Sequence, residues 1–172
     1  MNLIIDIGNT RTKLALVQLH EVLEIFTYPT QKPDFDAIFQ FLKKHSFSNA
    51  IISSVAQDIP EPLLNHISYL NPIILNKNLM IPVGIAYHSP ETLGNDRIAL
   101  AVAGNELFPN QNVLIIDAGT CITYDFVNRQ NIYLGGAISP GIEIRFSLTY
   151  VYAKIAVRSE ERRVGKECRS RW

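Results

Sequence analysis

Two stretches of this chain repeat one another. Leu3-Ile4-Ile5-Asp6-x-Gly8 returns as Leu114-Ile115-Ile116-Asp117-x-Gly119. Each stretch is an apolar run, typical of a buried strand, that ends in an Asp-x-Gly turn. A β-rich return segment and a further strand-like segment follow both copies. The repeat therefore predicts an α/β fold built from two related halves.

Periodicity and turn residues divide the chain into predicted elements. The first half continues through several strands and helices after its repeat, whereas only one helix follows the second repeat. The second half is either naturally short or truncated. We expect strands over 2–7, 12–19, 22–28, 50–55, 72–75, 112–117, 121–127 and 132–138, a short strand near 85–87, and helices starting at 33–34 and over 61–70, 94–107 and 141–156.

The formal net charge of zero conceals an uneven distribution. Residues 158–172 hold six of the 16 basic and three of the 16 acidic side chains, so residues 1–157 carry a net charge of −3. The overall balance of 16 basic and 16 acidic side chains argues against a strongly basic nucleic-acid binder. Two cysteines cannot form a disulfide framework, and neither a leader sequence nor a run of 18 apolar residues is present. We expect a cytoplasmic protein without a membrane partner.

The Asp-x-Gly turns are candidate phosphate sites. Asp6 ends an apolar strand, where α/β sheets place ligands, and Gly8 permits close approach of a backbone. Thr10 adds a hydroxyl, and the carboxylate can hold a cation. A plain β-turn explains one such copy equally well. Because Asp117 repeats the arrangement, we expect two facing turns that grip a metal-bound nucleotide.

Two further segments could carry chemistry. In Gly94-Asn95-Asp96-Arg97, Asp96 could accept a proton and Arg97 could bind a carboxylate or phosphate, or the segment could simply cap a helix. That helix is expected to present Ile98, Ala101, Val102 and Asn105 on one face. Gly135–Gly141 predicts a close backbone approach or a turn into the next helix, with a ligand-free loop as the alternative. P-loop, GxGxxG, HExxH, zinc-cluster and GxSxG patterns do not occur.

In order, Asp6–Lys13, Tyr87 with Gly94–Arg97, Asp117–Thr120 and Gly135–Gly141 resemble the motifs of the type III pantothenate kinase family. The resemblance covers about residues 1–157. It implies the actin-like, sugar-kinase-like ATPase fold, in which a ribonuclease-H-like core is duplicated, here with an incomplete second half.

The resemblance also implies a reaction, the ATP-dependent phosphorylation of pantothenate that begins coenzyme A synthesis. Asp96 would be the base, Asp6 would lie near Mg²⁺, and Asp117 would hold K⁺ or NH₄⁺. Family members are homodimers whose pantothenate pocket is completed at the interface. The implied ATP-binding residues are Asp6, Ile7, Gly8, Asn9, Thr10, Arg11, Thr12, Lys13 and Thr120, and the implied pantothenate-binding residues are Tyr87, Gly94, Asn95, Asp96 and Arg97.

The C-terminal end departs from the family pattern. Relatives run well beyond 172 residues, and their additional part supplies adenosine contacts. We therefore expect a first half over 1–110, the start of a second over 111–157, and a non-native tail over 158–172, with a native solvated helix as the alternative for the tail. The chain is accordingly expected to be poorly stable and weakly active. Alternatives to this kinase are an inactive fragment, a non-catalytic ATP-binding regulator and a kinase for another hydroxy acid.

Overall fold

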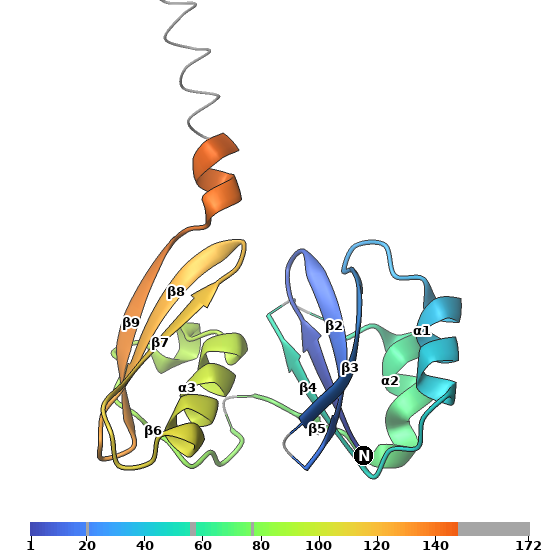
Figure 1. Ribbon diagram of the computed structural model, residues 1–172, viewed down its shortest axis with the longest axis horizontal. Helices are drawn as coiled ribbons and strands as arrows, with labels where there is room; N and C mark the ends of the chain where they lie inside the picture. Colours follow the sequence, from blue (N-terminus) through green and yellow to red (C-terminus); the bar gives the residue numbers. More distant parts are fainter. Residues whose placement is uncertain (20, 56–57, 77, 148–172) are drawn as a thin grey trace, which may run out of the picture. The chain divides into compact units, whose positions relative to one another are not determined.

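The computed structural model describes residues 1–19, 21–55, 58–76 and 78–147. Its contacts divide the chain into two compact units, Met1–Leu114 with Asp125–Gly135, and Ile115–Tyr124 with residues from Gly136 onward. The predicted α/β class is confirmed. Figure 1 labels the elements β1 (Asn2–Ile7), β2 (Arg11–Gln18), β3 (Glu21–Pro29), α1 (Phe35–Lys43), β4 (Asn49–Ser54), α2 (Glu61–Ile67), β5 (Ile73–Ile74), β6 (Gly84–Ile85), α3 (Asn95–Leu107), β7 (Val113–Ala118), β8 (Cys121–Val127) and β9 (Ile132–Pro140), with short 3₁₀ helices at Ser68–Leu70 and Pro90–Thr92.

The first sheet has the strand order β3-β2-β1-β4-β5. An antiparallel meander forms β1 to β3, and β4 and β5 then add parallel to β1. A helix precedes each of these parallel strands, α1 before β4 and α2 before β5, because parallel neighbours need a long crossover. This order is that of a ribonuclease-H-like half, as the sequence resemblance implies.

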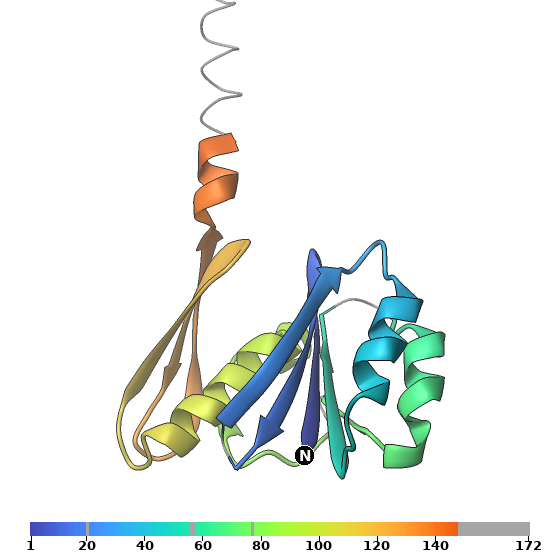
Figure 2. The ribbon, with the colours of Figure 1, turned by 45° about the vertical axis from the view of Figure 1, so that its right-hand side comes forward.

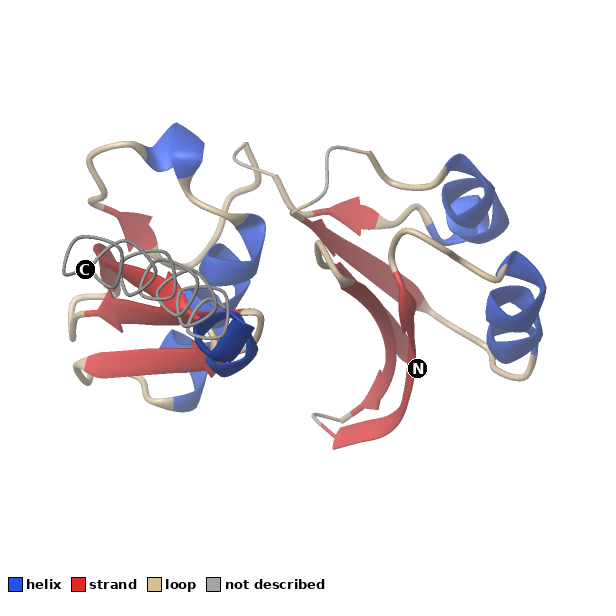
Figure 3. Cartoon of the chain, turned by 90° about the horizontal axis from the view of Figure 1, so that it is seen from above, coloured by secondary structure: helices blue, strands red, loops and turns tan. Residues whose placement is uncertain are grey.

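Alternation along the strands builds the first core. In β1, Leu3, Ile5 and Ile7 are buried, whereas the residues between them face the other way. Helices α1 and α2 lie on the buried face (Figure 3). Both helices contribute apolar side chains to a core that consists of Leu3, Ile5, Ile7, Leu14, Leu16, Tyr28, Ile38, Phe41, Leu42, Ala50, Ile52, Leu63 and Ile67.

The helices begin where the sequence predicts. Asp34 caps α1, and its Oδ1 accepts a hydrogen bond of 3.0 Å from the backbone N–H of Ala37. The helix expected over 61–70 is α2 followed by a 3₁₀ turn, which ends at Asn71 in the left-handed region at φ 45°.

The second sheet repeats the opening of the first. Its order is β6-β9-β8-β7, so β7, β8 and β9 correspond to β1, β2 and β3 (Figure 2). The turns also correspond. The N–H of Gly8 donates to the carbonyl of Arg11, the first residue of β2, and the N–H of Gly119 donates to that of Cys121, the first residue of β8.

The two copies differ in what covers them. Leu3 and Ile5 are 0% exposed, whereas their counterparts Leu114 and Ile116 are 60% and 58% exposed. No helix among the described residues buries this part of β7 in the way that α1 and α2 bury β1.

The chain after β9 is described only in part. Residues 142–147 are helical, which agrees with the start of the helix expected over 141–156. The rest of that helix and the tail over 158–172 lie outside the described residues. The expected boundary between residues 110 and 111 stays a prediction.

Candidate functional site

Asp6 stands in a polar row on the first sheet. It is half-buried, and it pairs in register with Lys13 of β2 and Ser53 of β4. All three residues lie on the face opposite α1 and α2, because the alternating positions are buried under the helices. Directly opposed residues have Cβ atoms about 5 Å apart. A carboxylate, an ammonium group and a hydroxyl therefore gather near the carboxyl end of β1.

The turn after β1 is tightly closed. Gly8 donates to Arg11 over 3.1 Å, and a Cβ at residue 8 would lie 2.8 Å from the Arg11 carbonyl oxygen, so only glycine fits without a shift. The Thr30 Oγ1 donates to the Gly8 carbonyl over 2.8 Å and lies 3.0 Å from the Thr12 Oγ1. Sequence reasoning missed Thr30, because nothing local connects it to a turn formed some twenty residues earlier.

The second turn carries Asp117 and Thr120, and both residues are exposed. The Thr120 carbonyl accepts a hydrogen bond of 3.0 Å from the backbone N–H of Gly141. A Cβ on Gly141 would collide with the carbonyl oxygens of Gly119 and Thr120. The close backbone approach predicted for 135–141 is therefore real, although strand β9 extends to Pro140 and occupies most of that segment.

Helix α3 begins at the predicted site residues. Gly94 is its N-cap residue, and the Asp96 Oδ1 accepts a hydrogen bond of 2.8 Å from the backbone N–H of Arg97. The negative carboxylate thus lies at the positive end of the helix dipole. The Asn95 Nδ2 donates to the Ser54 carbonyl over 3.1 Å, which ties the start of α3 to the end of β4.

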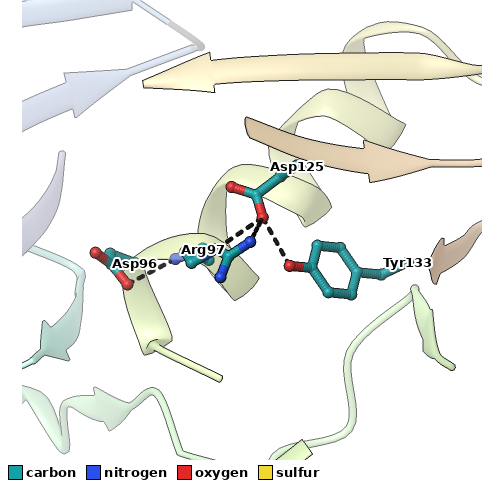
Figure 4. Close-up of polar contacts among 4 residues, drawn as sticks. All are labelled: Asp96, Arg97, Asp125 and Tyr133. Carbon is teal, nitrogen blue, oxygen red and sulfur yellow. Dashed lines mark hydrogen bonds and ion pairs between the residues drawn. The ribbon is translucent and has the colours of Figure 1, made fainter. Parts of the chain in front are cut away.

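Arg97 is buried rather than extended into solvent. Arg97 is 6% exposed, and its Nε and Nη2 lie 2.8 Å and 2.6 Å from the Oδ1 of Asp125 (Figure 4). The Tyr133 hydroxyl donates to the same oxygen over 2.6 Å. Asp125 is 0% exposed, so this is a buried ion pair with a neutral third partner.

Burial and charge oppose one another at these groups. Burial alone would lower the pKa of Arg97, but the hydrogen bond and the charge of Asp125 outweigh it and hold that pKa above its ordinary value. Burial, followed by the hydrogen bond to Asp125 and its charge, raises the pKa of the Tyr133 phenol well above its ordinary value. Arg97 is therefore a fixed cation and Tyr133 a fixed neutral donor.

Tyr87 joins the same group. Strand β6 pairs with β9, and the N–H of Ala86 donates to the Tyr133 carbonyl over 2.9 Å. The Tyr87 ring consequently lies edge-on to the Tyr133 ring, with centroids 6.3 Å apart. Gly135 makes room for Tyr87, since a Cβ there would lie 3.2 Å from the Tyr87 Cδ2. The structure thus links Tyr87 to Arg97 through Tyr133 and Asp125.

Sequence reasoning missed Asp125 and Tyr133, although one signal was available. Asp125 occupies an inward position of β8 between the buried Thr123 and Val127. A charged residue at an inward strand position requires a partner of opposite charge, because an unpaired buried charge is costly. On α3, the predicted face holds two of the four buried residues, Ile98 and Ala101, and Arg97 and Gly104 are buried beside them.

The side chains that could ligate the expected cations are few. Among the described residues, no three His, Cys, Asp or Glu side chains gather to form a metal site of their own. Mg²⁺ that arrives with ATP needs only one or two carboxylates, because phosphate oxygens and water complete its shell. Asp6, a single carboxylate beside a tight turn, fits that mode of binding.

The family model for type III pantothenate kinase matches residues 2–168. The chain belongs to the type III pantothenate kinase family. Among its relatives in this family, the Christiangramia forsetii enzyme is 44% identical over 151 residues, which cover 85% of this chain and 60% of the relative. The Phocaeicola vulgatus enzyme is 37% identical over 166 residues, which cover 93% of this chain and 67% of that relative.

This pantothenate kinase family member spans about 60% of the length of several relatives that it matches. Among solved structures, a Campylobacter jejuni protein described as a Baf family transcriptional activator is 26% identical with a TM-score of 0.49, over 89% of this chain and 60% of that chain. An Aquifex aeolicus Ppx/GppA phosphatase is 18% identical with a TM-score of 0.44, over 86% of this chain and 54% of that chain. The family assignment rests on the sequence relatives. In the part of the chain that the structure describes, no helix is both long and apolar enough to cross a bilayer.

Proposed function

We propose that this chain carries the pantothenate- and phosphate-binding residues of a kinase that transfers the γ-phosphoryl group of ATP to the primary hydroxyl of pantothenate. The product, 4′-phosphopantothenate, is the first intermediate of coenzyme A synthesis. The observation that carries the proposal is the adjacency of Asp96 and Arg97 at the start of α3 in a chain of this family. Asp96 supplies a base for a hydroxyl and Arg97 supplies a cation for a carboxylate, and pantothenate has these two groups at its two ends.

Asp96 is the proposed base. Its Oδ1 is held by the Arg97 backbone N–H, which fixes the carboxylate at the helix start. In phosphoryl transfer the protein mainly positions the acceptor and stabilises charge. Asp96 accepts the proton of the hydroxyl as the hydroxyl oxygen bonds to the γ-phosphorus of ATP and the bond from that phosphorus to the bridging oxygen breaks, with ADP as the leaving group. Arg97 binds the carboxylate at the far end of the substrate. Tyr87, Gly94 and Asn95 complete the proposed contacts to pantothenate.

The turn over Asp6–Lys13 is the proposed phosphate loop, and Thr120 is a second phosphate contact. Asp6 would hold Mg²⁺ and Asp117 would hold K⁺ or NH₄⁺. When bound, these cations neutralise charge on the ATP phosphates. Lys13 lies beside Asp6 in register and supports the same role, because an ammonium group binds phosphate as a point charge.

The assembly and location of the protein are also proposals. Family resemblance supports a homodimer whose second copy completes the pantothenate pocket, and a cytoplasmic location.

The test is to measure ATP- and K⁺-dependent formation of phosphopantothenate by the 172-residue chain, together with pantothenate binding by calorimetry. Asp96→Asn keeps the oxygen that accepts from Arg97, so the start of α3 is preserved. We expect turnover to fall by about 10²- to 10⁴-fold, with ATP affinity unchanged. The control is Asp58→Asn, which changes an exposed aspartate in the same way. Wild-type turnover by Asp96→Asn, or a chain that neither binds nor phosphorylates pantothenate, contradicts the proposal.

A further inference from the structure

We propose that Asp125 and Tyr133 are positioning residues that hold the Arg97 guanidinium so that its edge away from Asp125 is presented to the carboxylate of the substrate. The inference rests on the proposed function, since it assigns residues that prepare the same site for a carboxylate. Neither residue belongs to the motifs that carry the family resemblance. Both lie on strands of the second sheet, Asp125 on β8 and Tyr133 on β9.

The geometry of the guanidinium is the first argument. Arg97 offers five N–H donors in a rigid plane. Asp125 Oδ1 engages the edge formed by Nε and Nη2, at 2.8 Å and 2.6 Å. Apart from this ion pair, the buried Nη2 has no hydrogen-bond partner among the described residues. The other edge of the guanidinium is therefore directed away from Asp125. That edge can donate hydrogen bonds to an incoming planar anion.

Burial is the second argument. Asp125 is 0% exposed and the Arg97 side chain is 8% exposed, so neither side chain can rotate into water without breaking the pair. A buried ion pair contributes little net stability compared with apolar side chains of the same size. Its advantage is a defined orientation, because a guanidinium fixed before the substrate arrives loses less conformational freedom on binding.

Tyr133 is the third argument. Its hydroxyl donates to Asp125 Oδ1 over 2.6 Å, so one oxygen accepts from both Arg97 and Tyr133. In Figure 4, the Arg97 guanidinium and the Tyr133 hydroxyl both reach this one oxygen of Asp125. The same phenol ring contacts the Tyr87 ring at 6.3 Å. Tyr133 therefore orients two of the proposed pantothenate contacts, one through Asp125 and one directly.

Tyr133→Phe is the most direct test, because it removes one hydroxyl and keeps the ring that packs against Tyr87. Binding is measured for pantothenate and for an analogue in which a neutral amide replaces the carboxylate. We expect the preference for pantothenate over the amide to fall about three- to tenfold, the range expected for a weakened charge-assisted hydrogen bond. ATP affinity should remain within about twofold. Asp125→Asn should reduce the preference further.

The matched control is Tyr124→Phe, which removes a phenol hydroxyl from the outward-facing side of β8 and should leave the preference unchanged. A purely structural role for Tyr133 predicts equal weakening of both ligands and an unchanged preference, and that result overturns the inference. If the wild-type chain binds no pantothenate, the proposed function fails. The second measurement, which needs no ligand, then tests by itself whether Asp125 and Tyr133 hold the Arg97 guanidinium in place.

The second measurement needs no ligand. In ¹⁵N NMR spectra near pH 7, the Nε–H of Arg97 should exchange with water more slowly than that of the exposed Arg129, because it is buried against Asp125. Tyr133→Phe should accelerate this exchange without shifting the Arg129 signal. Equal exchange at Arg97 and Arg129 in the wild-type chain overturns the proposed positioning.

Discussion

Thr30→Val tests how the turn after β1 is stabilised. A hydroxyl has one hydrogen, and the hydrogen of Thr30 is donated to the Gly8 carbonyl over 2.8 Å. The 3.0 Å bond between the two threonine hydroxyls must then be donated by Thr12. Valine has nearly the same shape as threonine but can neither donate nor accept. One substitution thus removes the acceptor of Thr12 and the donor to Gly8.

The expected cost follows from these two bonds. Each net hydrogen bond contributes about 1 kcal/mol to the free energy of unfolding, and a buried hydroxyl left unpaired costs about 1–3 kcal/mol. Thr12 is 1% exposed, so its hydroxyl cannot be rehydrated without opening the sheet. We expect Thr30→Val to lower the free energy of unfolding by about 2 kcal/mol.

Urea unfolding followed by far-UV circular dichroism measures this change. At an m-value of about 2 kcal/mol/M, the midpoint should fall by about 1 M. Thr30→Ser retains the hydroxyl, so it serves as the control and should stay within about 0.5 kcal/mol of the wild-type chain. A Thr30→Val chain as stable as the Thr30→Ser chain would refute the reasoning that Thr30 clamps the turn.

Three further changes test other parts of the structure. Gly141→Ala should destabilise the chain by about 1–3 kcal/mol in urea unfolding, because the new Cβ meets two backbone carbonyls. Gly84→Ala is the control, since a Cβ there makes only ordinary contacts and should not destabilise the chain. Equal effects of the two substitutions would contradict this prediction. Asp34→Ala should cost about 1 kcal/mol and lower the helical circular dichroism signal, while Asp34→Asn should keep most of the cap; no difference between them would argue against capping. Because the folded pKa of Tyr133 lies above its unfolded value, stability is fully present below about pH 10 and declines above it by about 1.4 kcal/mol per pH unit. Unfolding at pH 9 to 11 should show a shallower decline for Tyr133→Phe, and parallel declines would contradict the shifted pKa.

Local patterns were sufficient to predict most of the elements. Strands β1 and β8 have the predicted bounds, because apolar alternation and an Asp-x-Gly turn are both properties of a few neighbouring residues. The repeat of Asp6 at Asp117 also predicted that β7 to β9 would follow the order of β1 to β3, and the sheets confirm it.

The contacts within the site could not be predicted in the same way. Arg97 and Asp125 are 28 residues apart, and only the fold brings them together. Counting apolar residues along α3 predicted a face of Ile98, Ala101, Val102 and Asn105 but gave no reason to expect a buried charge, because a periodicity argument treats a charge as a solvent-exposed residue. Arg97 is buried instead, since Asp125 neutralises it. Whether the turns at Asp6 and Asp117 act on one nucleotide stays a prediction.

The pairing of β6 with β9 has a consequence for synthesis on the ribosome. Strands β1 to β5 end at Ile74, so the first sheet can form early. Tyr87 and Arg97 emerge next, but their partners Asp125 and Tyr133 are translated later, at about 5–20 residues per second. For a few seconds, the Arg97 cation has no carboxylate to bury against. A nascent chain released before Tyr133 can therefore contain the whole first sheet, but not the assembled group of Arg97, Asp125 and Tyr133.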